Sequence, residues 1–464
     1  MPLETARSPG RKLMFAILIG LALAIPIFCV WLLVYDRQSQ SEQARTSITE
    51  GWGGRQAMSG PVLVIPYRQT TAAADVVVEG TAQISRTREV WRELTLEPEM
   101  VDIASRVRPE VRRRSIYDAV VYSATASGTA RFAFPPDLDR FGVALAQMDL
   151  SRAELRFGLS DPRGLGANPR VSVDGKPARL QPGGGSGPGK GFFAFVDAAG
   201  LTQQAMRIGF DYDFRGNSAL ALAPHAGDTH WKVESSWPNP SFGGDFLPAG
   251  RNVGAKGFAS DYRIGNLALG RSLISTGDKG SNRITADLPG RGGVASVEAA
   301  DGSSEIQLAS IDLIQTVDLY SRVNRATKYG FLFIGFTFLA LLMFDVIGGI
   351  RVSAVEYLLM GAAIVLFFVL LLAFAEVIGF TAAYISASAA IAGLNTAYSA
   401  AVLGSWRRGY VIGGLLIGLY AVLYILLGLE AFSLLIGSIL LFAALAGVMY
   451  LTRRIDWGGV AAAE

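Results

Sequence analysis

The feature that most constrains this chain is an uninterrupted apolar run near its start. Residues 13–34 (LMFAILIGLALAIPIFCVWLLV) contain no charged side chain. About 20 apolar residues in a helix cross the ~30 Å hydrocarbon layer of a membrane. The run is too long for the core of a signal peptide, and no clear small-residue cleavage site follows it. We therefore expect an uncleaved membrane anchor.

The C-terminal third of the chain is divided by charged residues into further apolar segments. Their lengths predict five more transmembrane helices, six in all. The first of the five is short unless the Lys328 amine and the Asp345 carboxylate lie in the headgroup layer. The helices are expected at about residues 328–348, 356–375, 380–404, 410–429 and 431–451, in a bundle over 328–452.

The positions of lysine and arginine predict the orientation, because basic residues in short loops resist translocation. With six helices, all of the following residues fall on one side: Arg7, Arg11, Lys12, Arg351, Arg407, Arg408, Arg453 and Arg454. We expect residues 1–12 and the tail 453–464 in the cytoplasm. Residues 35–327 then form a large domain on the outer, periplasmic side.

The sequence of this outer domain predicts a β-rich fold. Short β-type runs are separated by glycine-rich joints, and "VSVDG" predicts a hairpin that turns at Asp174 and Gly175. The spacing is typical of a β-sandwich. Residues 181–191 (QPGGGSGPGKG) predict a flexible loop, with a sub-domain boundary as one reading. The expected fold class is an α+β membrane protein with a sandwich-like domain inserted between helices 1 and 2.

The composition and motifs exclude several classes of function. The single cysteine, Cys29, cannot build a disulfide framework. Basic and acidic residues are nearly balanced in the outer domain, which argues against nucleic-acid binding. No phosphate-cradling glycine motif follows a strand, so we expect no cofactor. The histidines in "HAGDTH", His225 and His230, are weak candidates for a metal site with Asp228, because their spacing matches no strong metal motif.

Two polar residues in the bundle are candidate functional residues. Glu376 is expected at the outer end of the third helix, either as a hydrated carboxylate that caps the amides near Thr381 or as a proton carrier. Asn395 lies in a fourth helix rich in alanine, serine and glycine. Small residues allow close helix packing in lipid, and a buried amide there needs a partner.

The chain resembles, nearly end to end, the CreD family of bacterial inner-membrane proteins, which is linked to cell-envelope integrity. The resemblance is carried by the following stretches: "GWGGRQAMSGPVLVIPY", "EVRRRSIYDAVVYSATASGTARF", "SSWPNPSFGGDFLP", "VDLYSRVNRATKYGFLFIGFTFLALLMFD" and "EYLLMGAAIVLFFVLLLAFAEVIGFTAAYISA". The family usually has Ser-Glu-His where this chain has Ala375, Glu376 and Val377. That departure argues against a proton relay there.

The sharpest outer motif of the resemblance is "SSWPNPSFGGDFLP". Prolines restrict a loop that carries three aromatic rings, and the loop reads as a plug over one end of a sandwich or as a rigid recognition surface. Its candidate residues are Trp237, Pro238, Pro240, Phe242 and Phe246.

Three functional hypotheses follow. The first is a non-enzymatic inner-membrane protein that supports envelope integrity or the envelope stress response by displaying its outer domain to a periplasmic or inner-membrane partner. The second is a small-molecule or ion transporter or channel built on the C-terminal bundle. The third is a periplasmic hydrolase. The sequence does not identify the partner, the ligand or the oligomeric state.

Overall fold

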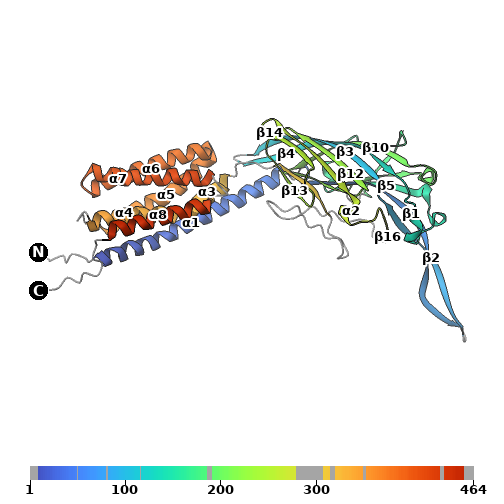
Figure 1. Cartoon of the computed structure of the whole chain (residues 1–464), viewed down its shortest axis with the longest axis horizontal. Coiled ribbons are helices and arrows are strands. Elements are labelled where there is room, and N and C mark those ends of the chain that lie inside the picture. The colour runs from blue at the N-terminus through green and yellow to red at the C-terminus, as the bar shows by residue number, and fades with distance from the viewer. Residues whose placement is uncertain are drawn as a thin grey trace. The chain divides into compact units, whose positions relative to one another are not determined.

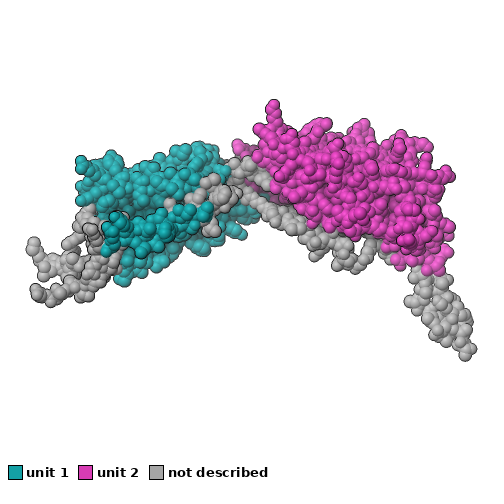
Figure 2. Space-filling view, viewed as in Figure 1, with its two compact units in different colours: residues 1–43, 317–464 teal, residues 44–316 magenta. Residues whose placement is uncertain are grey.

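The structure is a computed structural model, and it describes residues 9–49, 51–79, 82–114, 117–184, 191–277, 307–313, 319–347, 352–428 and 433–453. It divides into two compact units (Figure 2). Residues 1–43 and 317–464 form the helical unit, and residues 44–316 form the β unit.

The first helix, α1 (Pro9–Thr49), extends well beyond the apolar run at residues 13–34. It continues through the polar segment that follows, and Trp52 N–H donates to Thr49 O just after its last residue. The other helices of the helical unit are α3 (Leu319–Lys328), α4 (Gly330–Ile347), α5 (Ala354–Ile378), α6 (Phe380–Val402), α7 (Trp406–Gly428) and α8 (Ser433–Thr452) (Figure 1).

Among the described residues, four helical stretches are long and apolar enough to cross a membrane. They are Leu13–Thr49, Leu319–Asp345, Ala354–Ile378 and Trp406–Gly428. The helices α6 and α8 are also formed but are not among the four. The many alanines, serines and threonines of α6 lower its hydropathy, and within α8 only a shorter apolar helix, Gly437–Gly447, is identified. A count of six spans therefore remains a proposal.

The ends of α5 are set by local chemistry. Ser353 and Glu356 form a reciprocal capping box at its start. At its end Gly379, with φ of 79°, turns the chain directly into α6. The expected capping of α6 by Glu376 is not present, because α6 has no side-chain cap and the Glu376 carboxylate accepts a hydrogen bond from the Tyr320 hydroxyl instead.

The helices α6 and α7 approach closely through small residues. Gly409 faces Ala400, and Gly413 faces Thr396, so that a Cβ added at Gly413 would lie 2.2 Å from Thr396 Oγ1. Without a hydrophobic driving force between helices in lipid, such close van der Waals packing is a main source of association. This contact holds α7 against the polar helix α6.

The described residues of the β unit form two sheets. The nine-stranded sheet has the strand order β13 (Pro240–Gly244), β17 (Ala309–Leu313), β11 (Ala219–Ala223), β1 (Gln56–Glu79), β5 (Ala153–Leu159), β9 (Phe192–Val196) and β8 (Leu180–Pro182), with β2 (Ala82–Leu96) beside β1 and β16 (Ile274–Gly277) beside β2. The eight-stranded sheet has the order β14 (Gly250–Gly254), β15 (Gly257–Gly265), β12 (Asp228–Ser235), β3 (Met100–Arg114), β4 (Tyr117–Phe132), β10 (Met206–Asn217), β6 (Arg170–Val173) and β7 (Lys176–Pro177). A short helix, α2 (Asn266–Leu269), follows β15.

The inward residues of both sheets form one hydrophobic cluster. Phe157 of the nine-stranded sheet contacts the rings of Phe210 and Tyr212 from the other sheet, at centroid distances of 5.6 and 6.3 Å. The Tyr122 hydroxyl donates to Ala219 O, again from one sheet to the other. Burial raises the pKa values of the Tyr212 and Tyr262 phenols, so both stay neutral in this core.

The expected Asp-Gly hairpin is confirmed, because β6 and β7 pair across Asp174 and Gly175, both with positive φ. Residues 181–191 lie inside the β unit, where β8 and β9 pair directly with each other. Residues 185–190 of that segment, and Arg7, Arg351 and Arg454 of the predicted orientation signals, lie outside the described residues.

We predict that Gly413→Ala lowers the stability of the full chain in detergent by about 1–3 kcal/mol, because the new methyl group forces α6 and α7 apart. The adjacent Gly414 is the matched control, since nothing lies within 4 Å of a Cβ added there. Gly414→Ala should leave stability unchanged or raise it by up to ~1 kcal/mol. Thermal unfolding followed by circular dichroism measures both, and equal midpoints would contradict the close packing.

Candidate functional site

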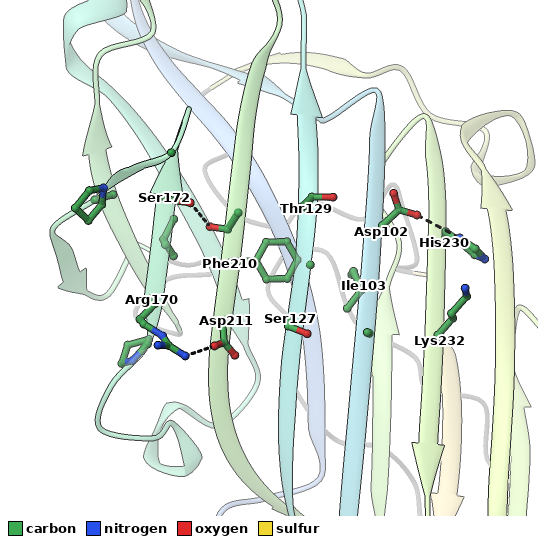
Figure 3. A pocket seen from close by; sticks show the side chains of 18 residues that line it. Asp102, Ile103, Ser127, Thr129, Arg170, Ser172, Phe210, Asp211, His230 and Lys232 are labelled. Atoms are coloured by element: carbon green, nitrogen blue, oxygen red, sulfur yellow. Dashed lines mark hydrogen bonds and ion pairs between the residues drawn. The ribbon is translucent and has the colours of Figure 1, made fainter.

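A hollow of the β unit lies on the outer face of the eight-stranded sheet (Figure 3). It is an open groove of about 1000 Å³ that crosses β12, β3, β4, β10 and β6. At ~4.8 Å between neighbouring strands, five strands span about 19 Å. Its length suits an extended polar chain better than a compact small molecule. Its outward-facing lining residues are Asp102, Ala104, Ser127, Thr129, Arg170, Ser172, Gly209, Asp211, His230 and Lys232.

The groove exists because the outward positions at its centre carry short side chains. In register across four strands, Ala104 lies opposite Ser127, Thr129 opposite Gly209, and Gly209 opposite Ser172. Alternate residues of a strand point to opposite faces, so these short side chains line the outer face while their neighbours fill the core. The groove is thus a region of the outer face where the side chains are short, and the strands beneath it remain paired.

Gly128 lies at the bottom of the groove, where a larger residue would not fit. A Cβ there would lie 2.1 Å from Asp102 O and 2.6 Å from Cζ of Phe210, whose buried ring passes beneath it on the core side. Only glycine permits this approach of ring and backbone. The core therefore supports the floor of the groove directly.

Charged groups stand at the two ends of the groove (Figure 3). At one end His230 lies between two carboxylates, with Nδ1 3.2 Å from Asp102 Oδ1 and Nε2 2.6 Å from Asp261 Oδ1. A protonated imidazole can donate to both oxygens at once, whereas a neutral ring donates to only one. At the other end Arg170 forms an ion pair with Asp211. The groove is thus nearly charge-balanced.

The structure does not bring the three candidate metal ligands together. His225 is buried, and its Nδ1 lies 3.6 Å from Glu97 Oε1. Asp228 is exposed at the start of β12, and His230 is engaged by Asp102 and Asp261. Among the described residues, no group of three or more His, Cys, Asp or Glu side chains is arranged to hold a metal ion.

The proline-rich loop leads into β13, the edge strand of the nine-stranded sheet. Trp237, Phe242 and Phe246 are partly buried and pack against the core. The rings of Phe242 and Phe258 meet edge to face at 5.7 Å. Pro238 and Pro240 are half-buried in the same loop. The three aromatic rings thus pack partly against the domain and keep part of their surface exposed.

In the helical unit, the two candidate residues differ in their surroundings. Glu376 is half-buried at the end of α5, and the Tyr320 hydroxyl of α3 lies 3.2 Å from its Oε1. Asn395 is only 1% exposed on α6. Its backbone carbonyl accepts a hydrogen bond from the Ser399 hydroxyl, whereas its side-chain Nδ2 has no hydrogen-bond partner among the described residues.

The groove was not among the sites expected from the sequence. One signal for it was present, because "SATASGTA" in β4 places short residues at every second position. That alternation predicts a strand face without large side chains, but only the pairing register brings it beside Ala104 and Gly209.

Two comparisons with known proteins bear on the whole chain. The sequence profile of the family described as "Inner membrane protein CreD" matches residues 8–458. The "Inner membrane protein CreD" of Escherichia coli (strain K12) is 30% identical over 441 residues, which cover 94% of this chain and 91% of that protein. The similarity therefore extends over both compact units.

Proposed function

The chain belongs to the CreD family of inner membrane proteins, and from this premise we propose that it supports the integrity of the cell envelope without catalysing a reaction. It is a multi-pass protein of the inner membrane. In the proposal, the helical unit anchors the chain, and the β unit engages a protein or envelope partner in the periplasm.

The proposed topology has six spans, with α6 and α8 added to the four most apolar stretches. At 23 and 20 residues, both are long enough to cross a bilayer. Both termini then lie in the cytoplasm, where the arginines of the short loops are favoured. Residues 35–327 lie in the periplasm.

The observation that carries the proposal is the groove on the eight-stranded sheet. It is open, its outward positions carry short side chains with the hydroxyls of Ser127, Thr129 and Ser172 among them, and its charged ends leave little net charge. Such a surface can form hydrogen bonds along an extended polar partner without a large desolvation cost. The groove therefore supports recognition of a periplasmic protein or another envelope component.

The contacts of His230 favour a binding role over a hydrolytic one. A general base needs a ring nitrogen that can accept a proton from the reacting group. Each nitrogen of His230 already faces a carboxylate oxygen, that of Asp102 or that of Asp261. This arrangement fixes the ring as part of the groove wall, which supports a non-enzymatic role.

A transporter or channel is the second candidate, and one observation favours it. Asn395 Nδ2 and the Tyr420 hydroxyl are buried without hydrogen-bond partners among the described residues, and Asp345 is only 4% exposed. Buried polar groups in membrane helices often mark the path of an ion or a substrate. In this alternative, α6 lines the path.

The topology predicts which introduced cysteines react with a membrane-impermeant maleimide. In a Cys29→Ser background, Thr202→Cys should be labelled in intact spheroplasts, because Thr202 is exposed in the β unit. Ser405→Cys, between α6 and α7, should be labelled only after the membrane is permeabilised. The Cys29→Ser chain without an added cysteine is the control. The reverse labelling pattern would refute the orientation.

Filling the groove should abolish the envelope function. Ser127→Trp places a large ring at its centre, and we expect this variant to fail to restore growth under envelope-acting detergents in a strain that lacks its own copy. Val253→Trp on β14 is the control, since Val253 is an exposed strand residue of the same sheet outside the groove. Both variants should unfold at the wild-type temperature. Full growth with Ser127→Trp would refute a role for the groove.

Replacing Asn395 separates the two candidate functions. Asn395→Leu removes an unpaired buried amide, so we expect equal or greater thermal stability and normal growth under the same detergents. Proton flux in reconstituted vesicles, followed with a pH-sensitive dye, should not differ from that of the wild type. A flux that is present in the wild type and lost in Asn395→Leu would favour the transporter.

A further inference from the structure

Beyond the groove, the outer face of the eight-stranded sheet becomes basic along β3. After Ala104, the outward positions of this strand are Arg106, Arg108, Glu110, Arg112 and Arg114. A second hollow, of about 350 Å³, opens between β3, β4 and β10. Its polar lining consists of Arg106, Arg108, Ser123, Thr125, Asp213 and Arg215. We call it the arginine hollow.

The strand register places two arginines on opposite sides of one serine. Arg108 of β3 lies opposite Ser123 of β4, and Ser123 lies opposite Arg215 of β10. Their Cα atoms are therefore two strand spacings apart, about 10 Å. Two arginine side chains at that separation can converge on one small anion above Ser123.

Arg215 is positioned by an aromatic ring and not by a carboxylate. Its guanidinium lies 4.7 Å from the centroid of the Trp52 ring, and that of Arg112 lies 3.7 Å from the same centroid. The Trp52 indole N–H donates to Tyr122 O at 3.1 Å, which fixes the ring. A cation held on an aromatic face keeps its N–H donors free for a ligand.

The arginine hollow carries excess positive charge. In the part of the chain that the structure describes, neither Arg108 nor Arg215 forms an ion pair. Arg106 is 3.9 Å from Glu234, and both side chains are more than 60% exposed, so that pair is weak. Asp213 is the one acidic residue among the lining residues. Two positive charges are therefore left without a partner.

We propose that the arginine hollow binds a phosphate group. The planar guanidinium offers two parallel N–H donors that match two oxygens of a phosphate, and arginine is favoured wherever such two-point recognition is needed. Arg108 and Arg215 bind oxygens on two sides of the anion, and the hydroxyls of Ser123 and Thr125 can donate to the oxygens that face the sheet. The phosphate is carried either by a lipid headgroup or by a soluble phosphate ester.

The test uses the full chain in detergent micelles, with one arm for each source of phosphate. Native mass spectrometry counts the molecules of phosphatidylglycerol retained, against the uncharged and phosphate-free digalactosyldiacylglycerol. Isothermal titration calorimetry measures binding of glycerol 3-phosphate. Arg108→Gln and Arg215→Gln should each weaken binding about tenfold, as expected for loss of a charge-assisted hydrogen bond. Both arginines are exposed, so the variants should fold normally.

Arg207→Gln is the matched control. Arg207 is exposed on the same face of β10, at the opposite end of the strand, and it does not line the arginine hollow. It should bind as the wild type does. Loss of phosphatidylglycerol retention in the two variants supports a lipid headgroup, and loss confined to glycerol 3-phosphate supports a soluble ester. Wild-type binding by both variants in both arms, or no binding by the wild type, overturns the proposal.

Discussion

A peptide group without a hydrogen-bond partner costs several kcal/mol in hydrocarbon, and this constraint governs how the chain is divided. Helices satisfy their own backbone, so the apolar segments fold as helices and gather in one unit. The side-chain hydroxyls follow the same rule, because Thr337, Thr396 and Ser399 each donate to the carbonyl four residues earlier. The Nδ2 of Asn395 is buried without a hydrogen-bond partner among the described residues. A substitution at Asn395 therefore distinguishes a purely structural bundle from a transport path.

The β unit is stabilised in a different way, by side chains that pack between two sheets. Its two sheets share one dry core, and rings such as Phe157 and Tyr212 meet between them. The core fixes the inward positions and leaves the outward positions free to vary. On the eight-stranded sheet this freedom produces two adjoining surfaces, a charge-balanced groove of short residues and a hollow lined by arginines. Both depend on strands that the core holds in register.

The sequence predicts local structure well and long-range pairing poorly. Run length alone places most of the helices within a few residues, and the preference of Asp174 and Gly175 for positive φ places the hairpin. The groove needs Asp102, Ser127, Gly209 and His230 side by side, and these come from four strands far apart in the sequence. The parallel pairing of β3 with β12 has no local signal. For this reason, the spacing of the histidines says little about what His230 contacts.

The structure differs from the sequence-based prediction at Glu376, which does not cap α6. The Glu376 carboxylate accepts a hydrogen bond from the Tyr320 hydroxyl on α3 in place of the amides that open α6. Gly379 already completes that turn through the backbone, so the turn needs no side-chain cap.

The contrast between paired and unpaired charge on the eight-stranded sheet has a further consequence. Dissolved ions screen charges over about 8 Å at physiological ionic strength and act least on pairs that are partly buried. The contact of His230 with Asp261 is partly buried and weakens least as salt rises, whereas the exposed Arg170–Asp211 pair and the field around Arg108 and Arg215 weaken more. A single protein face thus combines one contact that dissolved salt weakens little with exposed charges whose reach shortens as the ionic strength rises.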